Sequence, residues 1–391
     1  MFILEVFIYV FFAYVMNRFG VSSNRYVLQG GSLEKLDRGA WLWIIFYVLI
    51  CAIRWNVGTD CNSYIHIFEK GIISENRSNE YIWSLLVSFV YRLGLHSSVG
   101  LGIAAFLQIF FIIKAVKDYR YLLITIPIVL FGGNYYLEMQ NAVRQMIVAC
   151  MFLYASRWIV DKRPVPYVVL LYFASFIHHS ALMLIPLYML RYVPFITKGL
   201  AEKRTLCLSI FIVCFVLGNT PQFSGMVSFI SGFIQQFGYK EYEEHFIDLA
   251  TGQTENEERS FGPIQLSFFL TALSLIWFGP RLFKEYGSKI KYFNLWYILG
   301  FAYGCLYFLF CNVEYMFLRP LMHFELFQMI IISLLIYDFY IHKKEPQSSR
   351  NLPLLVIVLW ITIVWGIMKG MNNSYESTTY KTFITKGQLL K

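Results

Sequence analysis

The stretch SSVGLGIAAFLQIFFIIK, residues 97–114, is apolar along almost its whole length and carries its single charge, Lys114, at its end. A run of this length and composition predicts a helix that crosses a bilayer. Similar runs recur along the 391-residue chain, which is 58% hydrophobic, 19% aromatic and 15% charged, whereas a soluble domain carries about 25% charged residues. The sequence therefore predicts an all-α polytopic integral membrane protein. It shows no alternating ten-residue segments, which a transmembrane barrel would require.

Twelve such runs are predicted to be transmembrane helices, within a range of 10–14. They lie at about residues 2–17, 40–53, 97–114, 121–133, 143–160, 165–177, 179–193, 205–219, 263–280, 292–311, 320–340 and 352–369. The first run lacks a basic leader, contains Glu5 and has no small-residue cleavage site, so we expect a retained span and not a signal peptide. No Gly-, Ser- or Pro-rich linker divides the chain, and residues 1–391 are predicted to form a single transmembrane domain.

Loop charge predicts which helix ends face the cytoplasm. With the N-terminus outside, six consecutive inner loops hold 21 basic and seven acidic residues. The large extracytoplasmic loops are residues 54–96 and 220–262, and the second holds two basic and seven acidic residues. Cytoplasmic loops are rich in Lys and Arg, so we interpret the net charge of +9 as topology and expect no nucleic-acid partner. The same count places residues 370–391 outside, although they hold three lysines and one glutamate.

Residues 80–95 are also apolar enough to span, but a span here would invert every later loop. We therefore predict an aromatic-rich amphipathic helix that lies at the outer interface. A second helix of this kind is predicted near residues 226–237, inside the acidic outer loop.

The first outer loop opens with RWNVGTD, residues 54–60, and Tyr64 follows. Arginine presents a planar fork of donors that matches phosphate oxygens. Asp60 is a candidate to orient Arg54 or to accept a proton from a hydroxyl. The alternative is a structural ion pair between Arg54 and Asp60 at the interface.

A second motif, Asn141, Arg144 and Gln145, stands at the outer start of the run at 143–160. Spacings of three and four residues place these side chains on one face of a helix. An arginine at a helix N-terminus adds its charge to free N–H groups and to the positive end of the dipole, which favours an anion. The alternative is an arginine that only snorkels to the interface.

His178, His179 and Ser180 form a third motif, in a short turn between two predicted spans. Adjacent helical residues diverge by about 100°, so one histidine is expected to face inward. It is a candidate general base or cationic phosphate ligand. The alternative is a hydrogen-bonded structural histidine.

The fourth motif frames the run at 320–340. Pro320 is typical of a first helical turn, so Arg319 is expected at an outer helix N-terminus, with Glu314 before it and His323 one turn further in. Ionisable groups in membrane helices are costly and are functional candidates for that reason. Together the motifs favour an anionic lipid head group, best a diphosphate. Because the chain has no DxD, HExxH or Walker-type motif, we expect neither a metal nor a nucleotide.

On these residues the chain resembles the EpsG-type family of exopolysaccharide and O-antigen (Wzy-like) polymerases. The resemblance rests on R-x3-G-x-D-x3-Y from Arg54 to Tyr64, N-x2-R-Q from Asn141 to Gln145, H-x-S-A-L from His178, and a late arginine at Arg319. Cys61 stands where an aromatic residue is usual, and His323 where a tyrosine is expected. An architecture like that of the GT-C glycosyltransferases is compatible with the resemblance.

The resemblance implies a metal-independent glycosyltransferase of the bacterial inner membrane with no cofactor and with its active site on the extracytoplasmic face. It would transfer a growing glycan from undecaprenyl diphosphate to a sugar hydroxyl of the next lipid-linked unit. The implied partners are the undecaprenyl-diphosphate-linked oligosaccharide as donor and acceptor, the membrane lipid, and a chain-length regulator protein. The candidate catalytic residues are His178, Asp60 and Arg144. The candidate substrate-binding residues are Arg54, Arg144, Arg319, Asn141, Gln145, Tyr64, His179, Glu314 and His323.

Three other functions remain open from the sequence. An O-antigen ligase would use the same donor and similar arginines with a different acceptor. A membrane O-acyltransferase would need its histidine near a cytoplasmic acyl donor, and the histidine motif is predicted outside. A glycan flippase would place charges at mid-membrane in paired repeats, and no repeat is visible.

Overall fold

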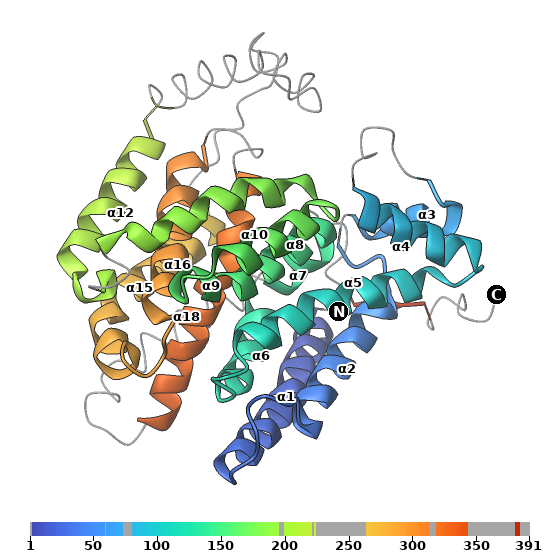
Figure 1. The fold of residues 1–391 in the computed structure, drawn as a ribbon, viewed down its shortest axis with the longest axis horizontal. Coiled ribbons are helices and arrows are strands. Elements are labelled where there is room, and N and C mark those ends of the chain that lie inside the picture. The colour runs from blue at the N-terminus through green and yellow to red at the C-terminus, as the bar shows by residue number, and fades with distance from the viewer. Residues whose placement is uncertain are drawn as a thin grey trace.

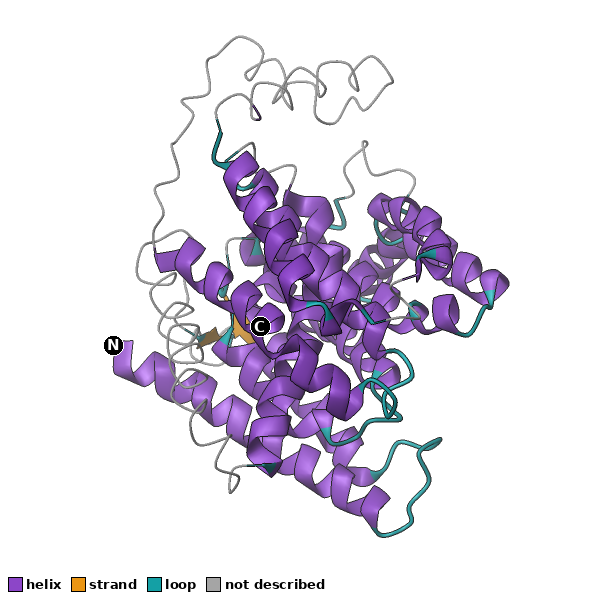
Figure 2. Cartoon of the chain, turned by 90° about the vertical axis from the view of Figure 1, so that its left-hand side faces the viewer, coloured by secondary structure: helices purple, strands orange, loops and turns teal. Residues whose placement is uncertain are grey.

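Helices make up nearly all the regular structure of the residues that the structure describes (Figures 1 and 2). The structure is a computed structural model that describes residues 2–58, 60–72, 80–133, 135–194, 199–220, 223, 263–312, 318–342 and 380–383. Up to residue 160 the elements are α1 (Phe2–Leu28), α2 (Arg38–Ala52), β1 (Arg54–Trp55), α3 (Cys61–Lys70), α4 (Tyr81–Arg92), α5 (Ser97–Ala115), α6 (Leu122–Gly132), α7 (Tyr135–Asn141), α8 (Val143–Ala155) and α9 (Arg157–Val160). They continue with α10 (Pro164–Ser175), the 3-10 helices η2 (His179–Tyr192) and η3 (Leu200–Glu202), α12 (Arg204–Gly218), α15 (Pro263–Tyr286), α16 (Phe293–Phe310), the 3-10 helix η5 (Arg319–Leu321), α18 (Met322–Ile341) and β2 (Lys381–Thr382).

Five helices among the described residues are long and apolar enough to cross a membrane: Ser97–Ala115, Val143–Val160, Gln265–Tyr286, Phe293–Phe310 and Arg319–Ile341. Helices α6 and α7, which meet at 71°, add a sixth if they are counted as one span. The prediction of twelve spans is therefore not confirmed. Helices α2, α10 and α12 are apolar but short, and 15 residues of α-helix reach only about 22 Å. The predicted span at 352–369 lies outside the described residues.

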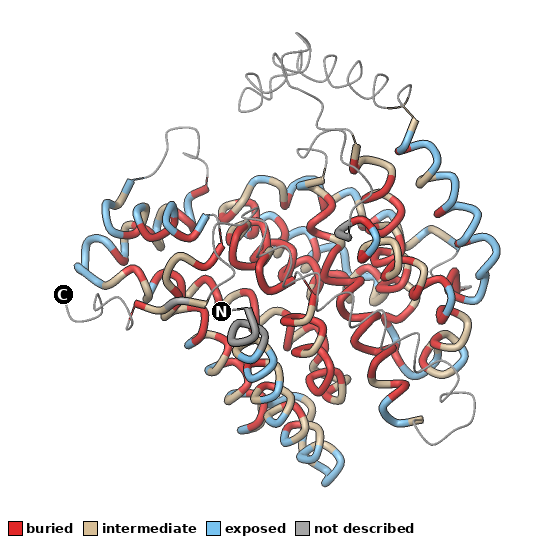
Figure 3. Tube along the Cα trace, turned by 180° about the vertical axis from the view of Figure 1, so that it is seen from behind, coloured by how far each residue is buried: buried red, intermediate tan, exposed pale blue. Residues whose placement is uncertain are grey.

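Helices α1, α10 and α12 carry large apolar residues that are exposed. Figure 3 colours the chain by how far each residue is buried. On α12 the exposed apolar residues are Leu206, Leu208, Ile210, Ile212, Val213, Val216 and Leu217. A protein in water seldom exposes a continuous apolar face of this size. Contact with the hydrocarbon of a bilayer removes the free-energy cost of exposing such a face to water. The apolar helices and their outward faces together indicate a membrane-embedded protein.

Helix α18 forms the core of the bundle. Its side chains are buried almost continuously from Met322 to Phe339, and it packs against α6, α8, α15 and α16. Most of these buried side chains are apolar, and a helix that is apolar on nearly all sides is typical of such a central position.

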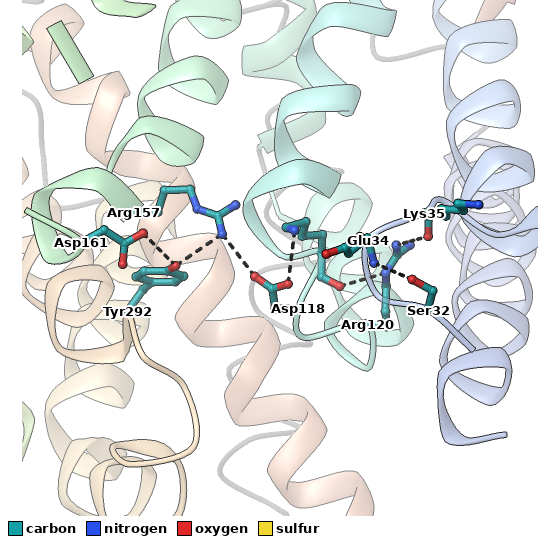
Figure 4. Close-up of polar contacts among 9 residues, drawn as sticks. Ser32, Glu34, Lys35, Asp118, Arg120, Arg157, Asp161 and Tyr292 are labelled. Atoms are coloured by element: carbon teal, nitrogen blue, oxygen red, sulfur yellow. Dashed lines mark hydrogen bonds and ion pairs between the residues drawn. The ribbon is translucent and has the colours of Figure 1, made fainter. Parts of the chain in front are cut away.

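The loops gather at two ends of the bundle. We call one the paired end; it consists of residues 29–37, 116–121, 156–163 and 287–292, which ion pairs and hydrogen bonds tie together (Figure 4). We call the other the motif end; it consists of residues 53–60, 80–96, 135–145, 176–180 and 318–323, which are joined by the contacts described below. All the predicted motifs that the structure describes lie at the motif end.

The region after β1 holds two amphipathic helices. Helix α4 corresponds to the predicted segment 80–95; it buries Trp83, Val87 and Val90 and exposes the opposite face. Helix α3 was not predicted, although its buried residues Cys61, Tyr64, Ile65 and Phe68 follow helical spacing. The helix predicted near residues 226–237 lies outside the described residues.

Candidate functional site

Arg54 is a buried cation at the motif end. It follows α2 in the two-residue strand β1, and only 1% of it is exposed. Its Nη2 donates to the carbonyl of Gln140 at 3.3 Å, while Nε and Nη1 have no hydrogen-bond partner in the described part of the chain. The groups around the guanidinium include the thiols of Cys51 and Cys61 and the hydroxyl of Tyr136.

No carboxylate among the described residues forms an ion pair with Arg54. The predicted alternative of an Arg54–Asp60 ion pair is therefore wrong. Asp60 instead lies exposed before α3. Burying a charge without a counter-ion costs free energy of folding. An anionic ligand that bound next to Arg54 would offset this cost.

The turn after β1 lies against Asn141. Asn56 has φ 49° and Gly58 has φ 90°, and a Cβ on Gly58 would lie 2.1 Å from Oδ1 of Asn141. Asn141 is 5% exposed, and neither Nδ2 nor Oδ1 has a partner among the described residues. A second buried polar group with open hydrogen-bonding capacity therefore lies next to the Arg54 turn.

A break between α7 and α8 places Asn141 in this position. Ala142, with φ −84° and ψ 50°, leaves the helical conformation. Gln108 of α5 donates through Nε2 to the carbonyls of Met139 at 2.8 Å and Val143 at 3.3 Å. Irregular backbone in a membrane protein needs such donors, so Gln108 stabilises the break.

The break corrects the prediction that Asn141, Arg144 and Gln145 share one helical face. Asn141 ends α7, whereas Arg144 and Gln145 belong to the first turn of α8. Spacing alone did not reveal the break, because the Gln108 side chain that stabilises it is more than 30 positions away in the sequence.

Arg144 differs from Arg54 because it has a carboxylate partner. Its Nη1 forms an ion pair with Glu80, and its guanidinium lies 5.9 Å from the Trp83 ring centre. Both Glu80 and Arg144 are largely buried, at 6% and 11% side-chain exposure. Glu80 was missed from the sequence, where it appeared only as the start of an amphipathic segment.

Arg319 joins the motif end through its backbone. Gln145 donates through Nε2 to the Arg319 carbonyl, and the Arg319 residue itself is exposed in η5. Glu314 lies outside the described residues. The third and fourth motifs meet at His323, which is 1% exposed.

Ser180 connects two histidines. Its Oγ lies 2.6 Å from Nδ1 of His178 and 2.9 Å from Nε2 of His323. Nδ1 of His323 faces the Pro320 carbonyl at 3.0 Å and therefore carries a proton, so neutral His323 presents Nε2 as an acceptor. The Ser180 hydroxyl lies between two imidazole rings, and because it has a single proton it can donate to only one of these two nitrogens at a time.

His178 also caps η2. Its Nδ1 accepts from the backbone N–H of Ser180 at 3.3 Å, so neutral His178 carries its proton on Nε2 and presents a donor there. His96 and Ser98 make the same cap on α5, at 3.2 Å. The cap is therefore structural in both places, and the bridge from Ser180 to His323 is what distinguishes the His178 motif.

The remaining predicted residues take different positions. His179 is exposed, as expected when only one of two adjacent histidines faces inward. Tyr64 is 7% exposed and packs against Trp83 with ring centres 5.8 Å apart. Among the described residues, no group of three His, Cys, Asp or Glu is arranged to hold a metal ion.

Comparison with known sequences supports a single family. The sequence model of the EpsG family matches residues 40–382. The chain belongs to the EpsG family. This confirms the resemblance, and every described segment of the motif end lies within the match. The EpsG family is associated with glycan polymerisation. No curated protein and no solved structure matches the chain.

Proposed function

We propose that this EpsG-family protein is a polysaccharide polymerase of the bacterial inner membrane. It transfers a growing glycan from undecaprenyl diphosphate to a sugar hydroxyl of the next lipid-linked repeat unit, on the extracytoplasmic face. The observation that carries the proposal is Arg54, a buried guanidinium with two donors open and no carboxylate partner among the described residues. Family membership supports the reaction class.

Arg54 and Asn141 provide the contacts that the leaving diphosphate needs. As the bond between the anomeric carbon of the sugar and the diphosphate oxygen breaks, negative charge grows on the diphosphate oxygens. Hydrogen-bond donors held in place lower the barrier most where this charge develops. Arg54 supplies Nε and Nη1, and Asn141 supplies Nδ2. Arg319 adds exposed positive charge at the same end. Arg144, paired through Nη1 with Glu80, holds α4 against the site and contributes its open Nε donor.

The proton from the acceptor hydroxyl goes to Asp60 in this proposal. Neutral His178 presents Nε2–H and therefore acts as a donor to phosphate or sugar oxygens, because its Nδ1 is engaged by Ser180. Asp60 is an exposed carboxylate at the end of the Arg54 turn and can accept a proton. Direct attack of the hydroxyl inverts the anomeric centre. A polymer linkage with the same configuration as the donor linkage would contradict this mechanism.

The test is a polysaccharide gel from a deletion strain that expresses the wild type, Arg54→Ala, Arg54→Lys or the control Arg191→Ala. Arg191 is the control arginine because it also has no carboxylate partner among the described residues and lies outside the motif end; its guanidinium contacts the rings of Tyr188 and Tyr192 and donates to the Tyr188 hydroxyl. We expect a ladder from the wild type and Arg191→Ala, and only single repeat units on the acceptor from the deletion and Arg54→Ala. Arg54→Lys should restore part of the ladder.

Other outcomes would contradict the proposal. A normal ladder from Arg54→Ala would remove its main support. Long chains without the gene would favour acyl modification or transport, and loss of all glycan from the acceptor would favour a ligase or flippase. With purified protein and lipid-linked repeat units, we expect elongation with release of undecaprenyl diphosphate, unchanged by EDTA; loss of activity in EDTA would contradict metal independence.

A further inference from the structure

The segment 380–383, which we call the C-terminal strap, returns to the motif end and pairs with the strand that carries Arg54. Strands β1 and β2 are antiparallel, with Arg54 opposite Thr382 and Trp55 opposite Lys381. The sequence indicated only that this tail lies on the same side as the motifs. The pairing places it directly against the backbone of the buried cation.

The C-terminal strap supplies hydrogen bonds that α2 lacks at its end. The last carbonyls of a helix have no donor within the helix. The Tyr380 hydroxyl donates to the Ile50 carbonyl, and the Phe383 N–H donates to the Ile53 carbonyl at 2.9 Å. The last turn of α2 and the start of β1 are therefore completed by residues more than 300 positions later in the chain.

Two aromatic rings anchor the C-terminal strap. Phe383 is fully buried, with its ring centre 5.1 Å from that of Trp55 and 4.5 Å from that of His96. The Tyr380 ring lies 4.9 Å from that of Phe12 on α1. These contacts tie α1, β1 and the start of α5 together around Arg54.

We propose that the C-terminal strap is a positioning element that holds Arg54 in the geometry for the donor diphosphate, an inference that rests on the proposed function. Among the described residues the Arg54 guanidinium has one hydrogen bond, to Gln140, which by itself fixes the backbone weakly. The turn that follows contains two positive-φ residues, Asn56 and Gly58. The backbone of Arg54 is therefore held by α2 on one side and by the strap on the other. Preorganised donors of this kind bind without further ordering cost.

The test measures binding of undecaprenyl diphosphate to purified full-length protein in detergent, with undecaprenol as the uncharged control ligand. We expect Phe383→Ala to raise the Kd for undecaprenyl diphosphate about tenfold, while Phe383→Leu, which keeps most of the buried side chain, changes it less than about threefold. A defect in folding alone would lower the fraction of protein that binds and leave the Kd unchanged. That result would overturn the proposal.

A double-mutant cycle separates this proposal from the proposed function. If the strap acts through Arg54, Phe383→Ala should have little further effect on the Kd in an Arg54→Ala background, because coupled residues are not additive. Additive effects would overturn the role of the strap and leave Arg54 in place. If Arg54→Ala does not change the Kd, the diphosphate site of the proposed function fails instead.

A cross-link provides a rescue. Trp55 and Lys381 are opposite in the register, and antiparallel partners lie at Cα separations of about 4.5–5.5 Å, within reach of a disulfide. Trp55→Cys combined with Lys381→Cys should bind weakly when reduced, because the Trp55–Phe383 packing is lost. Oxidation should restore the Kd to within about threefold of wild type. Failure to cross-link, or cross-linking without recovery, would contradict the proposal.

Discussion

The arginines at the two ends of the bundle differ in whether a carboxylate lies next to the guanidinium. At the paired end, Arg120 lies 3.5 Å from Asp37. Figure 4 shows that Arg120 also donates to the Lys35 carbonyl, at 3.0 Å, and that Arg157 lies 3.3 Å from Asp118. At the motif end, Arg54 is as deeply buried as Arg120 but has no carboxylate partner among the described residues. The same chain therefore satisfies a buried guanidinium at one end and leaves another open.

We interpret this difference as one of role: an arginine with a carboxylate partner stabilises the fold, whereas an arginine without one is a candidate to bind an anionic substrate. Removing a guanidinium from water costs several kcal/mol unless an anion compensates. At the paired end the protein supplies the anion, so the charge holds loops together. At the motif end we expect the substrate to supply it. Arg144 is intermediate, because Glu80 partners it while its Nε stays open.

The largest stability effect is expected at the paired end. Arg120→Met leaves Asp37 buried without its cation and should destabilise the protein by about 3 kcal/mol. Thermal unfolding in detergent measures this loss. Adding Asp37→Asn should recover part of it, because asparagine keeps the cap on Gly39 without the charge. If Arg120→Met unfolds at the wild-type temperature, the paired end does not depend on this ion pair.

Two glycines with nearly the same positive φ provide the next comparison. Gly58 at the motif end and Gly30 at the paired end have φ of 90° and 88°, but a Cβ would meet Asn141 at 2.1 Å in the first case and nothing within 4 Å in the second. Gly30→Ala should cost about 1 kcal/mol of stability and leave the polymer normal. Gly58→Ala should lower polymer output at least about tenfold, since it displaces Asn141 from the site. Equal polymer from both variants would contradict the role of Asn141.

Matched serines test the histidine bridge. Among the described side chains, Ser98 forms its hydrogen bond with His96, whereas Ser180 lies between His178 and His323. We expect Ser180→Ala to lower the elongation rate about tenfold and Ser180→Thr to retain most of it. Ser98→Ala should leave the rate near wild type. If Ser98→Ala and Ser180→Ala lowered the elongation rate equally, the His178 motif would have only the role of a helix cap.

The smallest effect is expected for an exposed ion pair at the paired end. Lys291 pairs with Asp161 at 2.6 Å, but 62% of the lysine side chain is exposed. Exposed pairs contribute between about 0 and 1 kcal/mol, so Lys291→Ala should change neither the melting temperature nor the polymer measurably. A large loss of stability would show that exposed charge also matters at this end.

The sequence predicted the membrane class and the family, and it singled out short motifs that the structure brings to one end of the bundle, because apolar runs and short motifs are local signals. It did not predict the Arg144–Glu80 pair, the Gln108 contacts at the α7–α8 break or the pairing of Thr382 with Arg54. Each of these joins residues more than 30 positions apart. The count of twelve spans was not confirmed for a related reason: the sequence shows where apolar runs lie, whereas tertiary packing decides how far each run continues as a straight helix.

The most direct test of the account is to replace Arg54 by methionine and to measure both the melting temperature and the polymer. If Arg54 is a buried cation kept for the substrate, Arg54→Met should melt at or above the wild-type temperature, because an uncompensated charge has been removed, and should make no polymer. A melting temperature that falls as far as that of Arg120→Met, or a polymer ladder that persists, would contradict it.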